Sequence, residues 1–299
     1  MNFRALFRSL TPQFILDKYR TNKKRIVDAQ LSKDASEGNF LTRQQLIQDL
    51  KLMGIVEGDS LLLHCSMSKI GYLENGPQTL IDALLAALGA SGNLLMPTSP
   101  NKSLQLAHVQ QTTVFDSIKD KSQMGAISEA FRTMKGVHRS LNPVEPVSAF
   151  GPDAIWLTEG HLGEKSAYTA NSPFARLKDL NGKIAYVGVT LDNAGTSLHL
   201  LEDAVENFRF PVYFPDEFEQ TVIDENGKSH FVNVKVHNPE MSKQRKCDGL
   251  LPWFKENGVY EEFTLGKANV MLFDAKKMYD LMLEGYKEKG ITMYTPKGG

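Results

Sequence analysis

The chain has 299 residues, 41% of them hydrophobic, and its 34 Lys and Arg residues nearly balance its 35 Asp and Glu residues. This composition predicts a soluble globular protein of one large or two modest domains, and the net charge of -1 gives no general attraction to nucleic acid. The two distant cysteines, Cys65 and Cys247, argue against a disulfide framework or a zinc site and predict a reducing cytoplasm, and no apolar run of about 18 residues predicts a transmembrane helix.

The chain begins with a basic, amphipathic segment. Apolar residues recur at helical spacing from Phe3 to Leu10, and basic residues follow them. Residues 1–25 can therefore dock on the body of the protein, make peripheral contact with the inner face of a membrane, or serve as a targeting segment. Ser32–Asn39 is polar and indicates a linker, so we divide the chain into an extension, 1–38, and a domain, 39–299.

Helix and strand signals alternate over the next part of the chain. Thr42-Arg43-Gln44-Gln45 is a capping box that opens a helix. The elements expected after it are a strand at Ser60–His64, a turn at Cys65–Gly71, a helix from Pro77 to Leu88 and a strand at Asn93–Met96. Strands and helices joined by such short connections are typical of an α/β layer.

The middle of the chain has weaker signals. Leu104–Lys121 has no clear period and is expected to be a surface loop, and His138–Gly151 is expected to be irregular. The remaining expected elements are helices at Met124–Met134, after Pro152-Asp153 and from Ser172, and a strand at Ile184–Val189.

The last third contains a strong hairpin signal. Glu219–Asp224 and His230–Val236 flank Asn226-Gly227, which is the preferred sequence for a tight β-turn. Further on, the patterns predict a helix at Cys247–Asn257, a strand at Val270–Phe273 and a closing amphipathic helix at Lys276–Lys287.

One polar turn carries the clearest sign of chemistry. Thr196 or Ser197 can cap a helix whose first turn holds His199, with Glu202 three residues and Asp203 four residues further on. A carboxylate that accepts the proton of one imidazole nitrogen fixes the tautomer and raises the basicity of the other nitrogen, which makes a general base. The alternative is a histidine that only contributes to the packing of a helix start.

Several common enzyme classes lack their motifs in this chain. The sequence contains no P-loop, no G-x-S-x-G elbow, no G-x-G-x-x-G after its first strand and no H-E-x-x-H. What remains is a loop with Ser66 and Ser68 after a strand, a helix start at Pro77, and the His-acid pair. Backbone N–H groups in such a loop can bind phosphate, although a hydrogen-bonded turn has the same composition.

Taken in order, a set of short blocks resembles the aminoglycoside 3-N-acetyltransferases and their relatives over roughly residues 40–290. Each block is ordinary alone, but the ordered set is specific. The blocks are Gly58–Gly71, Pro77–Leu84, Gly92–Thr98, Phe115-Asp116, Ser122–Ile127, Arg139–Pro143, Gly151–Ala154, Ser172–Leu177, Thr196–Glu202, Gly266–Ala268 and Leu272–Ala275.

The resemblance implies a layered α/β/α fold, distinct from the GNAT fold, and transfer of an acetyl group from acetyl-CoA to an amine of an amino sugar. It implies direct transfer without a metal or a covalent intermediate. His199 would be the general base, and Glu202 would orient it. Asp192 or Asp203 could take this orienting role instead of Glu202. The Thr196-Ser197 turn or backbone N–H groups would stabilise the charge that develops on the thioester oxygen.

The same resemblance assigns the binding residues. Ser66, Met67 and Ser68 would face the CoA phosphates, and Lys69 would add charge there or remain solvated. Many antibiotic-modifying relatives carry a histidine before the proline that matches Pro143, and a polar group two residues after this proline. Asn142 and Glu145 occupy these positions here. We therefore expect Asn142, Glu145 and Asp192 to bind the acceptor, which can differ from an aminoglycoside and be a nucleotide-linked sugar of surface polysaccharide.

Two hypotheses of different classes follow. The first is an acetyl-CoA-dependent N-acetyltransferase, and the second is a non-catalytic relative that binds CoA or sugar as a partner protein in a polysaccharide pathway. The presence of both His199 and Glu202 favours the enzyme. A hydrolase that uses His199 and a serine is a distant third possibility, and the oligomeric state stays open.

Overall fold

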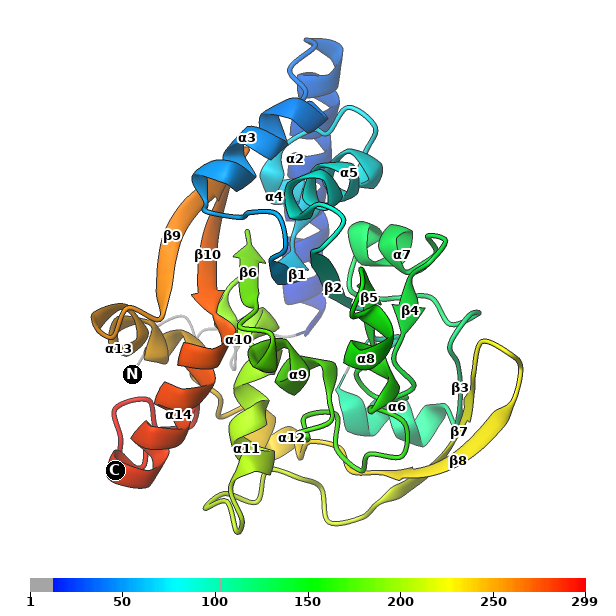
Figure 1. Ribbon diagram of the computed structural model, residues 1–299, viewed down its shortest axis with the longest axis vertical. Coiled ribbons are helices and arrows are strands. Elements are labelled where there is room, and N and C mark those ends of the chain that lie inside the picture. The colour runs from blue at the N-terminus through cyan, green and yellow to red at the C-terminus, as the bar shows by residue number, and fades with distance from the viewer. Residues whose placement is uncertain (1–12, 103) are drawn as a thin grey trace.

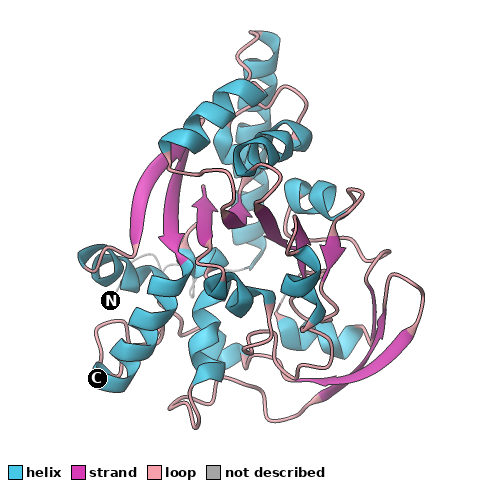
Figure 2. Ribbon diagram, in the orientation of Figure 1, coloured by secondary structure: helices cyan, strands magenta, loops and turns pink. Residues whose placement is uncertain are grey.

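A seven-stranded mixed sheet lies at the centre of the computed structural model, which describes residues 13–102 and 104–299 (Figures 1 and 2). Its strand order is β4-β5-β2-β1-β6-β10-β9. β1 pairs in parallel with both β2 and β6, whereas the outer pairs are antiparallel. The strands are β1 (Ser60–Cys65), β2 (Asn93–Pro97), β4 (His138–Arg139), β5 (Val147–Phe150), β6 (Lys183–Val187), β9 (Tyr260–Leu265) and β10 (Ala268–Asp274).

Both faces of this sheet are apolar. Successive side chains of a strand point to opposite faces, so a strand that is buried on both sides reads as a continuous apolar run. In β1, Leu61 and Leu63 belong to one buried cluster, whereas Leu62 belongs to the other. In β6, Ala185 and Ile184 divide between the clusters in the same way.

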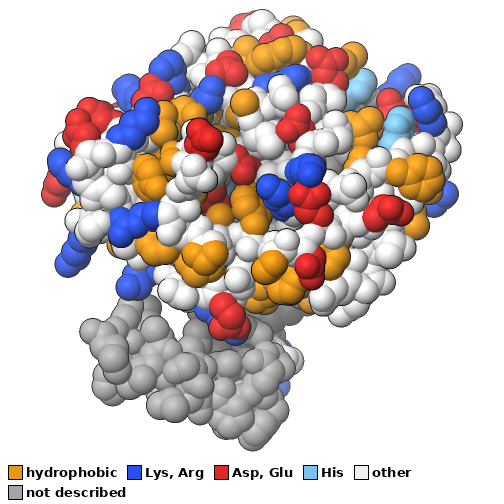
Figure 3. All heavy atoms as spheres, turned by 90° about the horizontal axis from the view of Figure 1, so that it is seen from below, with side chains coloured by type: hydrophobic (Ala, Val, Ile, Leu, Met, Phe, Trp, Pro, Cys, Tyr) orange, Lys and Arg blue, Asp and Glu red, His pale blue; other side chains and the backbone are white. Residues whose placement is uncertain are grey.

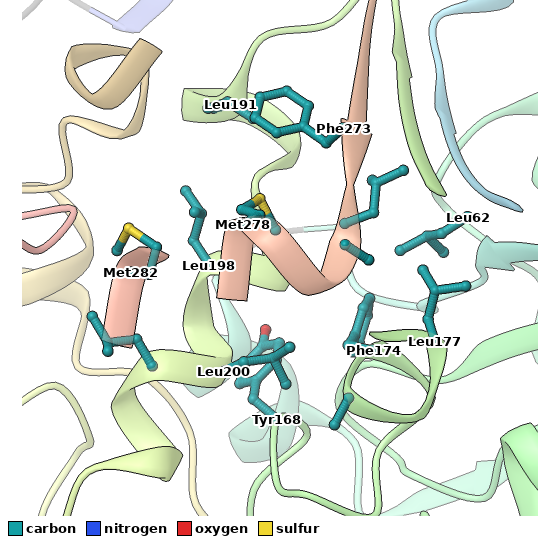
Figure 4. Close-up of a cluster of buried hydrophobic side chains, with 14 of the residues drawn as sticks. Leu62, Tyr168, Phe174, Leu177, Leu191, Leu198, Leu200, Phe273, Met278 and Met282 are labelled. Carbon is teal, nitrogen blue, oxygen red and sulfur yellow. The ribbon is translucent and has the colours of Figure 1, made fainter. Parts of the chain in front are cut away.

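Helices cover each face. The cluster that contains Leu61 includes side chains of α3 (Arg43–Leu52), α5 (Pro77–Leu88) and α7 (Ala126–Arg132). The opposite cluster, partly shown in Figure 4, includes Phe174 and Met278. Its helices are α8 (Ala154–Glu159), α9 (Pro173–Asp179), α11 (Leu200–Ala204), α13 (Leu251–Glu256) and α14 (Ala275–Lys289). The expected α/β/α layers are confirmed.

A second, three-stranded sheet contains the expected late hairpin. β7 (Phe218–Ile223) and β8 (Ser229–Val234) are antiparallel, and Gly227 has a φ of 78° in the turn between them. The third strand, β3 (Val114–Asp116), pairs in parallel with β7. The expectation of a surface loop at Leu104–Lys121 is therefore wrong, because this segment forms α6 (Gln105–Gln111) and β3. β3 depends on a partner about 100 residues away, which local periodicity does not reveal.

Three other expectations differ from the structure. His138–Gly151 is not irregular, because it contains the short strands β4 and β5, each antiparallel to a neighbour. β9 was not expected, and it is an edge strand whose exposed glutamates hide its alternation. The polar segment expected as a linker is helical as far as Ser36, the last residue of α2 (Gln13–Ser36). Asp34 of α2 binds Lys267 at 2.7 Å.

The basic, amphipathic pattern of residues 1–12 lies outside the described residues. The helix that follows it, α2, remains part of the extension that we separate from the domain. Among the described helices, none combines the length and the apolarity that crossing a membrane requires.

Candidate active site

The site lies where the parallel strands β1 and β6 end. The connections that leave them meet there, since the N–H of Ser66 donates to the carbonyl of Val187 at 2.9 Å. β2 lies on one side of β1 and β6 on the other, so the chain reverses its direction across the sheet at β1. Ligands of open α/β sheets bind outside the carboxyl ends of the strands at such a point.

The connection after β6 holds His199 in two short helical turns. α10 (Leu191–Ala194) is followed by the 3-10 turn η1 (Thr196–His199), and α11 begins at the next residue. The expected cap by Thr196 or Ser197 is wrong, because neither side chain caps this turn. The hydroxyl of Thr196 lies 3.4 Å from Nε2 of His64, and the hydroxyl of Ser197 is buried without a hydrogen-bond partner among the described residues.

Glu202 is the centre of a buried hydrogen-bond network. Its Oε2 lies 3.0 Å from Nδ1 of His199 and 2.7 Å from Nε2 of His237, and the hydroxyl of Tyr294 donates to Oε1 at 2.8 Å. Burial alone would raise the pKa of Glu202, but the two imidazoles lower the pKa well below its usual range. An ionised Glu202 accepts from both rings, which leaves Nε2 of His199 without a proton.

His199 itself is neutral in this environment. Burial lowers its pKa to about 3, and the charge of Arg245 acts in the same direction against the opposing effect of Glu202. The expectation that the carboxylate would shift this pKa upward is therefore wrong, because desolvation outweighs it. The imidazole is therefore unprotonated throughout the neutral range.

Aromatic rings fix the orientation of both histidines. Tyr168 lies 4.8 Å from His199 and 5.3 Å from His237 between ring centroids, and Tyr213 stacks on His237 at 5.3 Å. The hydroxyl of Tyr213 donates to Asp203 at 2.8 Å. Asp203 is therefore bound to Tyr213, and the carboxylate at His199 is Glu202.

A cleft of about 180 Å³ opens beside this network. Two of the three residues expected to bind the acceptor, Glu145 and Asp192, line it together with His199. Burial raises the pKa of Glu145 to about 7, against the opposing effect of hydrogen bonds that include one from Gln105. The other lining residues are Leu104, Gln105, Tyr168, Leu191, Asn193, Ala194, Gly195, Thr196, His237, Ser242, Arg245 and Cys247.

Asn142 is absent from the lining of the cleft and supports one of its residues. It is buried, and its Oδ1 accepts from the N–H groups of Val144 and Glu145, each at 3.0 Å. Asp192 is exposed and forms reciprocal bonds with Asp248, in which each N–H donates to the other side chain. Through its bonds to the backbone of Val144 and Glu145, Asn142 orders the turn that carries Glu145 into the cleft.

The residues expected to bind CoA form a separate surface at the same edge of the sheet. Ser66 and Met67 are half-buried at the start of α4 (Met67–Ile70), while Ser68 and Lys69 are exposed. Gly188, with a φ of 65°, packs against this loop, and a Cβ there would lie 2.6 Å from that of Lys69. The loop lies outside the lining of the cleft, and the His64–Thr196 contact joins the two surfaces.

Sequence reasoning missed the partners that complete the site. His237, Arg245 and Tyr294 belong to no motif, and Tyr168 lies in a segment without a regular pattern. In the described part of the chain, His199, Glu202 and His237 are also the cluster whose ligand atoms could hold a metal ion, since these atoms lie within 4.8 Å of one another. As they stand, these atoms are hydrogen-bonded to each other.

Comparison with known proteins gives a consistent family. A sequence model of the aminoglycoside 3-N-acetyltransferase family matches residues 62–286. Aminoglycoside N(3)-acetyltransferase VII of Streptomyces paromomycinus is 30% identical over 275 residues, which cover 83% of this chain and 92% of that protein. Aminoglycoside N(3)-acetyltransferase VIII of Streptomyces fradiae is 32% identical over 182 residues, which cover 56% of this chain and 63% of that protein.

Solved structures agree with this. The structure of AAC-VIa bound to sisomicin has a TM-score of 0.70 at 28% identity, over 83% of this chain and 98% of that one. The binary complex of AAC-IIIb with CoASH also has a TM-score of 0.70, over 83% of this chain and 97% of that one. AAC-IIIb is 23% identical to this chain, so this similarity shows a shared fold and nothing more.

Proposed function

The chain belongs to the aminoglycoside 3-N-acetyltransferase family of acyltransferases, and from this premise we propose that it acetylates an amine of an amino sugar with His199 as the general base. The acyl donor is acetyl-CoA. One observation carries the proposal: Nδ1 of His199 is held by Glu202 at 3.0 Å in the wall of the cleft, which leaves Nε2 to accept a proton.

The reaction needs a base because a sugar ammonium does not attack a thioester. A neutral amine forms the C–N bond, one of its two protons passes to Nε2 of His199 while the other stays in the amide, and the C–S bond breaks as the CoA thiolate leaves. The imidazolium then returns the proton to the thiolate or to water. Burial keeps His199 unprotonated at neutral pH, and the carboxylate of Glu202 opposes this effect by stabilising the imidazolium as it forms.

Glu202 acts through His199 as a positioning residue. It is ionised and fully buried, so it fixes the tautomer of the ring and stabilises the imidazolium that forms during the transfer. His237 and Tyr294 hold this carboxylate from the other side. The closest analogue of this geometry is the carboxylate that orients the histidine of a serine protease.

The charge that develops on the thioester oxygen needs a hydrogen-bond donor. Thr196 lines the cleft next to His199, and its hydroxyl has only a 3.4 Å contact with His64. Ser197 is buried outside the lining of the cleft. These observations support the hydroxyl of Thr196 in this turn as the source of the donor.

The loop Ser66–Lys69 is the proposed binding surface for CoA. It is accessible, lies at the carboxyl ends of β1 and β6, and carries two hydroxyl groups and an exposed lysine. The complex of AAC-IIIb with CoASH supports CoA as the carrier of the acyl group. Glu145 and Asp192 supply carboxyl groups to the cleft for the ammonium of the acceptor, and the AAC-VIa complex with sisomicin supports an amino-sugar acceptor.

Release of thiol from acetyl-CoA tests the proposal directly. We expect turnover only when an amino sugar is added, and we expect CoA to raise the melting temperature because it binds the folded state. At 100 times its dissociation constant, the gain would be about 2.7 kcal/mol. A folded protein that binds CoA but acetylates no amine would support the non-catalytic alternative, a partner protein in a polysaccharide pathway.

The N-terminal extension, residues 1–38, lies outside the proposed catalytic unit. The family match begins at residue 62, and among the described residues α2 contributes none to the cleft. A protein that starts at Asn39 should therefore keep its turnover and lose any attachment to anionic vesicles. Loss of activity in a truncated protein that still folds would assign the extension to the active site.

A further inference from the structure

Arg245 is a cation in the wall of the cleft that the proposed acetyl transfer does not use. It follows α12 (Pro239–Ser242), and the backbone of the next residue, Lys246, is anchored to the carbonyl of Met293 at 2.7 Å. Its Nη2 is buried and has no hydrogen-bond partner among the residues that the structure describes. Its Nε makes a long contact, 3.4 Å, with the hydroxyl of Tyr294.

The guanidinium remains charged in this position. Burial alone would lower the pKa of Arg245, but Tyr294 and Glu202 raise it above its ordinary value. No ion pair joins Arg245 to Glu145 or Glu202 within the described residues, although Arg245 and Glu145 line the same cleft. A buried, charged N–H donor without an acceptor is costly, so the site is complete only when an acceptor enters.

The group that would enter is an anion. A guanidinium presents its N–H groups in a planar fork, which matches the two oxygens of a carboxylate or a phosphate. The general surface charge does not select such a group, because basic and acidic side chains are interspersed on the face shown in Figure 3. Selection by charge therefore has to come from individual groups in the cleft.

The anion and the reacting amine can belong to one molecule. The hydroxyl of Tyr294 contacts Arg245 on one side and donates to Glu202 on the other, and Glu202 holds His199. Arg245 is thus separated from the proposed base by one phenol and one carboxylate. Glu145, in the same cleft, offers a carboxyl group to an ammonium.

We propose that the acceptor is an amino sugar that also carries an anionic group, a carboxylate or a phosphate, and that Arg245 binds this group while His199 receives the proton of the amine. The proposal rests on the proposed acetyl transfer, and it narrows the class of substrate. It predicts that a polycationic amino sugar is a poor acceptor, because its additional ammonium groups would meet the charge of Arg245.

The test compares acceptors that differ in charge. With saturating acetyl-CoA, kcat/KM is measured for glucosamine, glucosamine 6-phosphate, muramic acid and an aminoglycoside. We expect either the phosphate or the carboxylate sugar to exceed glucosamine by about 10- to 100-fold, the range of one charge-assisted hydrogen-bond pair, and the better of the two identifies the anion.

Variants of Arg245 assign this preference to a residue. Arg245→Gln should raise KM for the anionic acceptor until it matches glucosamine, and Arg245→Lys should retain part of the preference because it keeps the charge but not the fork. The control is Lys243→Gln. Lys243 is an exposed cation that pairs with Glu240; it lies two residues before Arg245 in the chain and outside the cleft. This variant should keep the wild-type preference.

Several outcomes would overturn the proposal. They are a wild-type preference for glucosamine or the aminoglycoside, an equal loss with all acceptors in Arg245→Gln, or a rise in KM for acetyl-CoA alone. If no amine is acetylated, the proposed function fails, and binding then decides the inference. Glucosamine 6-phosphate or muramic acid should still raise the melting temperature of the wild type but not of folded Arg245→Gln, and no shift with either sugar would refute it.

Discussion

The two connections at the carboxyl ends of β1 and β6 use their polar groups in opposite ways. After β6, His199 and Glu202 are buried and bonded to each other and to side chains from distant segments. After β1, Ser68 and Lys69 are exposed. A buried, satisfied network holds one geometry, as proton transfer requires, whereas an accessible loop can contact a large, charged carrier such as CoA.

The largest expected effect separates these two regions. His199→Ala should lower kcat by about 10²–10⁴-fold, because it removes the general base, and should leave the affinity for CoA nearly unchanged. Steady-state rates and the CoA-induced shift in melting temperature measure the two effects. His138→Ala, which changes an exposed histidine of β4, is the matched control and should keep its rate. Near-normal turnover in a folded His199→Ala protein would refute the mechanism.

Replacing the carboxylate should have a smaller effect on rate and a larger effect on stability. Glu202→Gln leaves the imidazole in place, but a neutral amide cannot accept from His199, His237 and Tyr294 as the carboxylate does. We expect a loss of rate below that of His199→Ala and a loss of stability of about 1–3 kcal/mol from the buried donor left without a partner. Urea unfolding measures the loss of stability, and kcat measures the loss of rate. An unchanged stability would show that the network does not hold the site.

Acid should destabilise the folded protein through three buried histidines, of which His64 lies in β1 and His199 follows β6. Burial lowers the pKa of His64, His161 and His199 to about 3 each, from an ordinary value of 6.5. Between these values the unfolded chain binds more protons than the folded protein, so stability is complete above pH 6.5 and falls as the pH decreases toward 3. Unfolding midpoints across this range measure the slope, which should become shallower in His161→Asn. A flat profile would contradict the buried, neutral state.

The smallest expected effect belongs to the loop after β1. Lys69→Gln should raise KM for acetyl-CoA by a few-fold, about the 0.2–1 kcal/mol of an exposed ionic contact, and leave kcat unchanged. The rise should shrink in high salt, because exposed charges are screened. Lys51→Gln, on an exposed position of α3, serves as the control. A change in kcat instead of KM would link the loop to the chemical step.

The sequence identified the features that depend on neighbours along the chain. The apolar runs of β1, β2 and β6 predicted strands of an α/β layer, and Asn226-Gly227 predicted the hairpin. The spacing of His199 and Glu202 predicted their contact, because residues three apart in a helical turn face each other. The short blocks that resemble the family gave the fold and the class of enzyme.

Only the tertiary structure supplied the rest. His237 lies 35 residues and Tyr294 lies 92 residues from Glu202 in the chain, so no local pattern links them to it. The same holds for β3 and for Arg245, whose Nη2 is buried by distant segments and has no hydrogen-bond partner in the described part of the chain. The sign of the pKa shift at His199 also depends on the fold. The neighbouring carboxylate raises this pKa, but burial lowers it by a larger amount, and no spacing in the sequence encodes burial.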